Sequence, residues 1–384
     1  MKKIIIVLWI TVLILLFFDY IGSAKEITLK YYCSLYSPDT ILGPTCVLTS
    51  QQKLWLLPYS LFATTHLYEF EFADCKFKEV HTYPDEAKYC FIPKTDTTTW
   101  KWIENSKVIC YPCTFSFRQI FLEMHSGNIF AFAYSLSKVE GSENEFLPRR
   151  LIFRLDTNEI KPIGLDKEEW ALFPLGRTCL KGDSLVSFVT FNKQDTNTKR
   201  FFCLYNLKTN EIKPIIDIQE VGIFVGKKLT EMGPAYFIDD SLVVCYLYRQ
   251  TPPIILNLKN NKYRLFKYQG LLSELKESNL RFWTNNNGDS MRTFLLGFLP
   301  NSSRVVVVGG ENKGTTFKDF VLQKVYLQFY LKEDLSLEKE FDIKFPLEKK
   351  YVFVDCFISP KSPSKIYFLF YTNDNVLDVY YVDI

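Results

Sequence analysis

A repeated hairpin constrains the fold of this 384-residue chain more than any other feature. Residues 155–163 read LDTNEIKPI, and residues 207–215 repeat them as LKTNEIKPI. Residues 257–263 (NLKNNKY) form a looser third copy. Each copy places a polar turn rich in Asn and Lys between an apolar strand and an alternating strand, a pattern typical of a β-hairpin. The sequence therefore predicts a repeating unit that ends in a hairpin.

A second feature precedes these hairpins and recurs through the whole chain. A polar turn opens into a run of β-branched and aromatic residues, which favour strands. The runs begin at Leu54, Ile129, Leu185, Leu242, Val305 and Ile366. Most copies lie about 60 residues apart, the length of one four-stranded sheet in a radial array. Residues 43–46, 176–179 and 233–236 precede three of the runs and are predicted to start innermost strands.

The repeats predict an all-β chain folded as a β-propeller with one domain over residues 25–384. Six blades account for this length, and seven are the alternative if residues 99–110 form a short extra blade rather than an added hairpin. Residues 271–279 are predicted to form one short inserted helix. Residues 27–35 are expected to pair with the last sheet near residues 376–384, because closing the ring leaves few open sheet edges.

The N-terminus has the pattern of a secretory signal peptide over residues 1–24. Lys2 and Lys3 precede an apolar stretch at 4–18, and small residues lead to a cleavage position after Ala24. An uncleaved anchor is the alternative, although a membrane span needs about 20 apolar residues. We expect an exported protein, either periplasmic, cell-surface or secreted, that is attached to a membrane only if this segment is retained.

The chain has 10 cysteines, and export permits disulfides. Cys75 and Cys90 flank a polar turn and are the candidate pair, although connectivity cannot be read from sequence. Cys203, Cys245 and Cys356 lie inside apolar runs and are predicted to be small buried apolar residues.

The repeating units resemble those of bacterial exported six-bladed β-propellers of the NHL and kelch kind. Residues 204–212 (LYNLKTNEI) carry the resemblance, because the phrase is typical of an outer hairpin in such proteins. The resemblance is architectural and covers most of the expected mature chain. The paired Gly and Trp-Asp signatures of narrower families are missing from the sequence.

Residues near the starts of the predicted innermost strands form the candidate ligand site. These are Arg118, Arg177, Arg292 and Asp355. Arginines that converge from different blades would bind a carboxylate, phosphate or sulfated sugar, because the planar guanidinium pairs with such groups bidentately. The alternative is that the arginines pair with local carboxylates or close the channel structurally.

Other patterns give weaker indications of chemistry. Residues 110–113 (CYPC) have the spacing of a redox pair, but the following residues alternate like a strand, whereas redox pairs precede a helix. His66, His81 and His125 are the only histidines and predict no metal site or hydrolytic triad. Residues 284–289 resemble a calcium loop without its distant Glu and are interpreted as a tight turn. Trp55, Trp100, Trp102, Trp170 and Trp283 could stack on sugars if exposed or pack between blades.

The composition and these patterns favour binding over catalysis. We expect a module that recognises an anionic small molecule, a glycan or a protein partner, with no cofactor and no catalytic residues assigned. The net charge of +3 without a basic block gives no indication of nucleic-acid binding. The alternatives are a propeller-type enzyme acting on a carbohydrate or lactone-like substrate, and a structural scaffold of the cell envelope.

Overall fold

The structure is a computed structural model of the chain. It describes residues 25–36, 45–48, 52–57, 66–82, 86–90, 100–102, 110–122, 129–138, 146–154, 159–162, 170–173, 179–181, 184–191, 199–206, 208–209, 211–217, 220, 232–247, 253–273, 291–299, 303–314, 321–345, 351–359, 361–372 and 376–384. Nearly all of these residues lie in strands, as the aromatic and β-branched composition predicts.

The described strands form six sheets, which we number along the chain. Sheet 1 contains β3 (Thr45–Leu48), β4 (Lys53–Leu57), β5 (His66–Glu71) and β6 (Lys76–Thr82). Sheet 2 contains β7 (Glu86–Cys90), β8 (Trp100–Trp102), β9 (Cys110–Leu122), β10 (Ile129–Lys138), β11 (Phe146–Arg154) and β12 (Glu159–Pro162). Sheet 3 contains β13 (Trp170–Phe173), β14 (Cys179–Lys181), β15 (Ser184–Phe191), β16 (Lys199–Asn206) and β17 (Ile212–Asp217).

The last three sheets follow the same plan. Sheet 4 contains β18 (Met232–Phe237), β19 (Leu242–Leu247), β20 (Ile254–Asn257) and β21 (Lys262–Leu265). Sheet 5 contains β22 (Met291–Leu299), β23 (Arg304–Gly314), β24 (Val321–Leu331), β25 (Leu337–Lys344) and the N-terminal β1 (Lys25–Thr28). Sheet 6 contains β26 (Tyr351–Ser359), β27 (Ser362–Thr372), β28 (Val376–Asp383) and β2 (Lys30–Tyr36).

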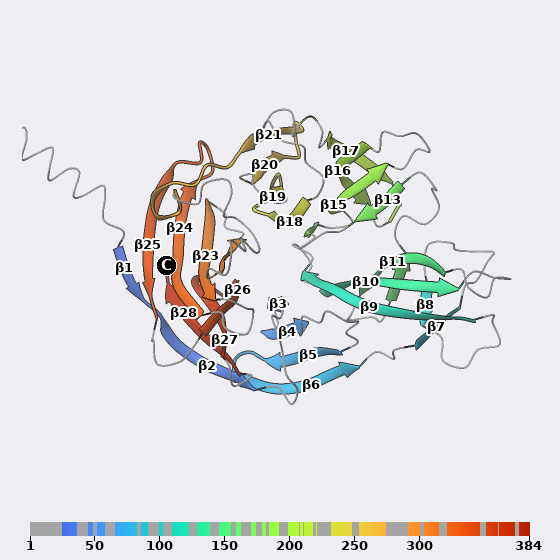
Figure 1. The fold of residues 1–384 in the computed structure, drawn as a ribbon, viewed down its shortest axis with the longest axis horizontal. Coiled ribbons are helices and arrows are strands. Elements are labelled where there is room, and N and C mark those ends of the chain that lie inside the picture. The colour runs from blue at the N-terminus through green and yellow to red at the C-terminus, as the bar shows by residue number, and fades with distance from the viewer. Residues whose placement is uncertain are drawn as a thin grey trace, which may run out of the picture.

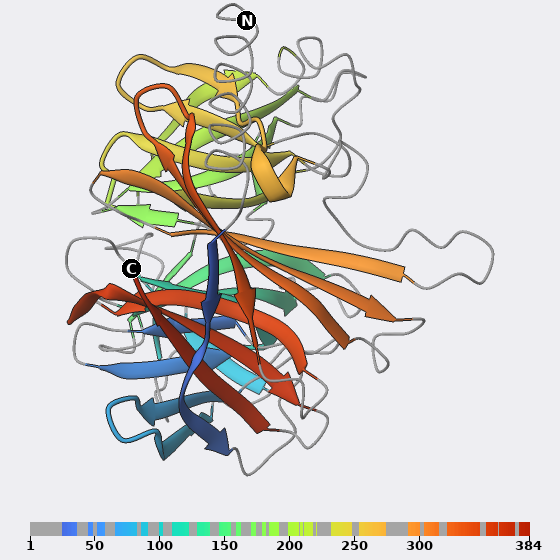
Figure 2. The same cartoon turned by 90° about the vertical axis from the view of Figure 1, so that its left-hand side faces the viewer.

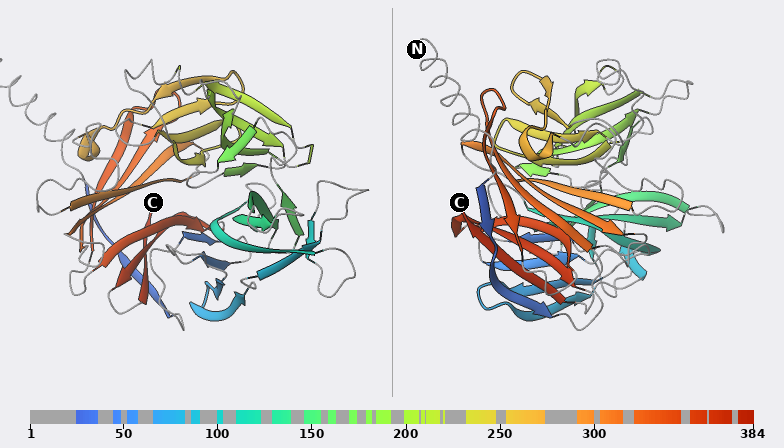
Figure 3. Two further views of the ribbon diagram at one scale, coloured as in Figure 1. Left: turned by 45° about the vertical axis from the view of Figure 1, so that its right-hand side comes forward. Right: turned by 60° about the vertical axis from the view of Figure 1, so that its left-hand side comes forward.

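The six sheets stand around a common centre (Figures 1 and 3). One strand from each sheet faces this centre, and we call these six the first strands. They are β3, β9, β14, β18, β22 and β26. Each contacts the first strand of the next sheet, and β26 contacts β3, so that the contacts form a closed cycle. This radial arrangement is the one that the repeat predicts.

Apolar side chains fill the spaces between neighbouring sheets. In sheet 4, Val243 packs with residues of sheet 3, and its neighbour Val244 packs with residues of sheet 5. Because successive side chains of a strand point to opposite faces, a strand buried on both faces needs a continuous apolar run. The runs that begin at Leu242, Val305 and Ile366 meet this need.

The repeat features lie where the sequence predicts them. All six apolar runs lie in the strand that follows the first strand of a sheet, which we call the second strand. The second strands are β4, β10, β15, β19, β23 and β27. The three outer hairpins are β11–β12, β16–β17 and β20–β21. Residues 99–110 form no seventh sheet among the described residues. They contribute β8, which pairs with β7 and β12 and helps to close sheet 2 on itself.

The N-terminal strands close the ring across two sheets. β2 pairs antiparallel with the C-terminal β28, from Lys30 opposite Tyr381 to Tyr36 opposite Val376, which confirms the expected closure. The preceding β1 pairs instead with β25 of sheet 5, in parallel. Figure 2 shows β1 and β2 in dark blue, crossing from the orange sheet to the red one. Leu29, between the two strands, is buried in the core that sheets 5 and 6 share.

A disulfide links this closure to the next sheet. Cys33 of β2 is bonded to Cys75, which lies in the turn between β5 and β6, with the two Cα atoms 6.2 Å apart. The predicted Cys75–Cys90 pair is therefore wrong. The correct partner comes from ring closure, which places β2 beside sheet 1, and no local spacing in the sequence indicates it.

The predicted inserted helix is described only at its start, as a 3₁₀ turn at Gly270–Leu272. Gly270 has φ of +57°, a conformation that glycine adopts without steric cost. A Cβ there would meet the Glu340 carboxylate, which accepts hydrogen bonds from the Leu271 N–H (2.7 Å) and the Gln328 side chain (3.0 Å). Glycine thus lets the connection from sheet 4 pack closely on sheet 5.

Candidate functional site

Three first strands leave the regular ladder at the same place in the repeat. We count positions along each second strand from Ile129, Leu242 and Ile366. The register shifts between positions 4 and 5 in β10 and β27, and between positions 4 and 6 in β19. Bulges of this kind are over-represented at barrel rims and next to active sites, where they re-aim a side chain. We call this place the bulge level.

The bulge level contains two of the predicted site residues, Arg118 and Asp355. Arg118 is itself the extra residue of the bulge in β9, between Phe117 and Gln119. Asp355 follows directly after the bulge in β26. In sheet 3, β13 and the first strand β14 both pair with β15, and Arg177 falls in the sequence between them, outside the described residues.

Arg292 lies at a different position along its first strand, β22. It is opposite Lys313, whereas Gly297 is opposite Val308, the fourth residue of the run that begins at Val305. Five residues of strand separate Arg292 from the bulge level, roughly 17 Å at the usual rise per residue. The register therefore groups Arg118 with Asp355 and sets Arg292 apart. A pocket shared by all the predicted residues stays a prediction.

Asp355 is the only predicted ligand residue whose side chain the structure describes. It is 3% exposed, and its Oδ1 atom accepts a hydrogen bond from the Cys356 N–H at 2.8 Å. This hydrogen bond joins the buried carboxylate to the backbone directly after the bulge, and buried polar groups need such partners. This arrangement favours a structural role for Asp355 at the level where Arg118 departs from the ladder.

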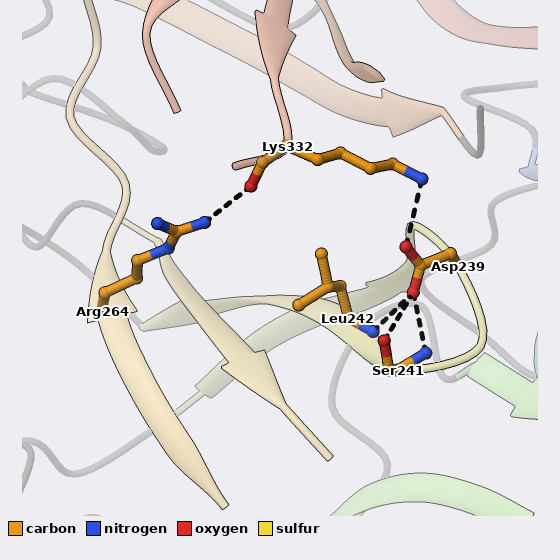
Figure 4. Close-up of polar contacts among 5 residues, drawn as sticks. All are labelled: Asp239, Ser241, Leu242, Arg264 and Lys332. Carbon is orange, nitrogen blue, oxygen red and sulfur yellow. Dashed lines mark hydrogen bonds and ion pairs between the residues drawn. The ribbon is translucent and has the colours of Figure 1, made fainter. Parts of the chain in front are cut away.

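A polar contact joins sheets 4 and 5 outside the bulge level (Figure 4). The Asp239 carboxylate accepts hydrogen bonds from the N–H groups of Ser241 (2.7 Å) and Leu242 (2.9 Å). Its other oxygen pairs with the Lys332 ammonium at 3.1 Å. Arg264 donates to the Lys332 carbonyl at 2.8 Å. Asp239 is thus a turn residue, as expected of Asp before a strand, and it also fastens neighbouring sheets.

This contact predicts an acid-sensitive contribution to stability. Burial raises the pKa of Asp239, but hydrogen bonds from Ser241, Lys332 and Leu242 outweigh it and hold the pKa below the ordinary value. The stabilisation is therefore present at neutral pH and is lost as the pH falls through the lowered pKa. We expect Asp239→Ala to cost about 1–2 kcal/mol in urea unfolding at pH 7. Asp239→Asn, which keeps an acceptor for the turn, should cost less. Equal stability of Asp239→Ala and the unchanged protein at pH 7 would contradict this role.

A buried polar cluster in sheet 6 has no counterpart among the sequence predictions. Asp378 is fully buried, and its carboxylate accepts hydrogen bonds from Ser34 and from Tyr351 (3.1 Å). The hydroxyls of Tyr351 and Tyr380 are 2.9 Å apart. Burial, followed by the contact with Tyr380, raises the pKa of Tyr351. The sequence feature that could have predicted this cluster is Asp378 itself, a single Asp inside an apolar strand. A buried carboxylate needs hydrogen-bond partners, so such a residue indicates a buried polar cluster.

Some of the remaining sequence predictions are confirmed, and others concern residues that the structure does not describe. Cys203, Cys245 and Cys356 are buried and form no disulfide, as predicted, and burial raises the pKa of Cys203. Trp55 is 7% exposed and packs in the interior. Residues 110–113 belong to β9, so that a strand and not a helix follows the first cysteine. The predictions for residues 284–289, His125 and Trp283 lie outside the described residues.

The described part of the chain lacks two features that would indicate a function. It holds no group of three His, Cys, Asp or Glu residues that could bind a metal ion. It also contains no helix of the length and apolar character needed to cross a bilayer.

No family model and no curated protein matches the chain. Among solved structures, it is similar to YCF48 from Cyanidioschyzon merolae, with a TM-score of 0.39, 10% identity and coverage of 89% of this chain and 83% of that one. It is also similar to the N-terminal domain of Nup159, with a TM-score of 0.40, 9% identity and coverage of 93% and 99%. These proteins are β-propellers. The chain has a β-propeller fold. This assignment rests on the sheets and on the cycle of first strands.

Proposed function

We propose that the chain is an exported six-bladed β-propeller that binds an anionic ligand at the bulge level of its first strands. The observation that carries the proposal is the recurrence of the bulge in β9, β18 and β26, with Arg118 as the extra residue of one. Register shifts also occur between outer strands, but these three lie at one position of the repeat in the first strands. A bulge that contains an arginine supplies the bidentate donor that carboxylates, phosphates and sulfates bind.

Export is supported by the Cys33–Cys75 disulfide, because disulfides persist in oxidising compartments and are rare in the cytosol. Cleavage after Ala24 would leave β1, which begins at Lys25, intact. N-terminal sequencing of the native protein tests this part. Lys25 as the first residue is expected, and a retained residue 1 would indicate an anchored protein instead. The six blades are supported by the six sheets of the described residues.

Ligand binding is tested by a thermal-shift screen of residues 25–384 against acidic sugars, sulfated sugars and phosphorylated metabolites. A ligand that binds only the folded protein at 100 times its Kd adds about 2.7 kcal/mol of stability. We expect at least one anion to raise the Tm, and Arg118→Ala or Arg177→Ala to remove the shift. Arg292→Ala is the matched control, because its position is far along the strand from the bulge level.

Two results would overturn the proposed site. One is a flat response across the anion panel, which would favour a protein partner. The other is a shift that survives both Arg118→Ala and Arg177→Ala.

A further inference from the structure

A single N-terminal segment joins three neighbouring sheets where the two ends of the chain close the ring, a place that we call the seam. Residues 25–36, which we call the clasp, pair with β25 of sheet 5 and β28 of sheet 6. The Cys33–Cys75 bond then joins the clasp to the β5–β6 turn of sheet 1. Every other sheet is built from strands that follow one another in the chain. The seam is therefore the place where closure depends on one short segment.

The clasp lies at an outer edge, and its disulfide is only half-buried. β2 is the end strand of sheet 6 and β1 is the end strand of sheet 5. Cys33 and Cys75 have intermediate exposure, whereas the thiols of Cys203, Cys245 and Cys356 are buried. A soluble dithiol can therefore reach the bond without unfolding the apolar layers between the sheets, because thiol–disulfide exchange depends on access to a sulfur.

The clasp also has polar links that do not depend on the disulfide. Lys30 pairs with Asp383 at 2.7 Å, and Tyr32 donates hydrogen bonds to the Phe72 and Ala73 carbonyls at 3.2 and 3.1 Å. Tyr31 and Tyr36 are more than half exposed. With few buried groups besides Leu29 and Leu35, the clasp has the character of a segment that opens locally before the rest of the protein.

We propose that the Cys33–Cys75 disulfide is a redox-sensitive lock on the clasp, which a dithiol reductant opens. A thiolate of the reductant attacks one sulfur, and the S–S bond breaks to give a mixed disulfide and one protein thiol. The second thiol of the reductant then displaces the other protein sulfur. Two electrons pass from the reductant, which leaves as its own disulfide, and Cys33 and Cys75 end as two thiols after taking up two protons.

Reduction removes the covalent limit on how far β2 can move from sheet 1. The bond closes a loop with a sequence separation of 42 residues, and its loss restores chain entropy to every state in which β2 is detached. The hydrogen bonds of β2 with β28 remain, so the clasp opens more often and does not leave permanently. In the described residues the clasp pairs with no strand of sheets 3 and 4, and these sheets are not expected to change.

Hydrogen exchange on the folded protein, followed by peptide mass spectrometry, tests this proposal. The protein is compared before and after treatment with dithiothreitol, with labelling of Cys33 and Cys75 as proof of reduction. Amide exchange in residues 30–36 is expected to become faster by on the order of 100-fold, while residues 242–247 and 254–257 keep their rates. The Cys33→Ser/Cys75→Ser variant should show the fast exchange without reductant and no response to it.

Three outcomes would overturn the lock. The first is a bond that stays intact under dithiothreitol until the protein unfolds. The second is unchanged exchange in residues 30–36 although both thiols are labelled. The third is faster exchange in all sheets together, which would make the disulfide a global support and not a lock on the clasp.

Discussion

Removal of residues 25–36 is expected to lower the urea midpoint of the protein strongly while the other sheets still unfold cooperatively. β2 supplies the outer strand of sheet 6, and its loss leaves the backbone edge of β28 unpaired. Leu29 and Leu35 are buried at the seam, at 5% and 1% exposure. Loss of each buried leucine costs about 2–5 kcal/mol, so the two together reach the lower end of total domain stability. The seam also loses its disulfide.

The measurement compares urea unfolding, followed by circular dichroism, of chains that begin at Lys25 and at Ser37. Both should unfold in one transition, and the second should do so at a clearly lower urea concentration. Leu35→Ala in the longer chain provides an intermediate, with a destabilisation of about 2–4 kcal/mol expected. If the chain that begins at Ser37 unfolded at the same urea concentration as the longer one, the N-terminal closure would be wrong.

Asp378→Ala is expected to destabilise the protein by about 3–5 kcal/mol, the cost of breaking a buried charged network by removing one partner. The substitution leaves the hydroxyls of Ser34 and Tyr351 without their acceptor in the core between sheets 5 and 6. Each buried hydroxyl that loses its acceptor contributes about 1–3 kcal/mol to this cost. The Tyr351–Tyr380 contact can compensate only in part, because it is already made.

Equilibrium urea unfolding of matched variants tests this value. Asp378→Asn keeps an acceptor for one hydroxyl and should cost less than Asp378→Ala. Asp383→Ala is the control on the same strand, because its carboxylate is about half exposed and pairs with Lys30 at the surface. We expect little change from it. Equal midpoints for Asp378→Ala and Asp383→Ala would show that the buried cluster does not stabilise the fold.

The second strands and the outer hairpins could be predicted because the repeat is local. A turn followed by an apolar run spans about ten residues, so a short stretch of sequence is enough to predict the strand. The second strands accordingly begin close to Leu54, Leu185 and Ile366. The pairing of the N-terminus with the last strand followed from the need to close a ring of repeats, and Tyr36 opposite Val376 confirms it.

The features that were missed depend on contacts between distant segments. Cys33 meets Cys75 only after β2 has joined sheet 6, and a spacing rule considers neighbours such as Cys90 first. β1, which precedes β2, pairs with β25 of sheet 5. Leu29, which connects β1 and β2, is buried in the core between sheets 5 and 6. No pattern in residues 25–28 indicates a partner more than 300 residues away.

The positions of the candidate site residues along their strands could not be predicted from the sequence. The sequence grouped Arg118, Arg177 and Arg292 because each stands near the start of an expected inner strand. The ladder register separates Arg292 from Arg118, and a single-sequence reading cannot fix strand boundaries to better than a few residues. The bulges themselves leave no reliable sequence signal except at Gly233 and Pro234, residue types that often mark an interruption of a ladder.

Zero-length crosslinking with a carbodiimide, followed by peptide mapping, tests the closed ring most directly. Lys30 and Asp383 lie 2.7 Å apart at the surface, and Lys344 and Glu26 lie 3.3 Å apart. Amide bonds are expected between both pairs, which would join the clasp to sheets 6 and 5. Lys78 and Glu71, 3.6 Å apart within sheet 1, serve as the control for the reaction. Formation of the Lys78–Glu71 crosslink without either of the other two would contradict a ring closed by the N-terminal strands.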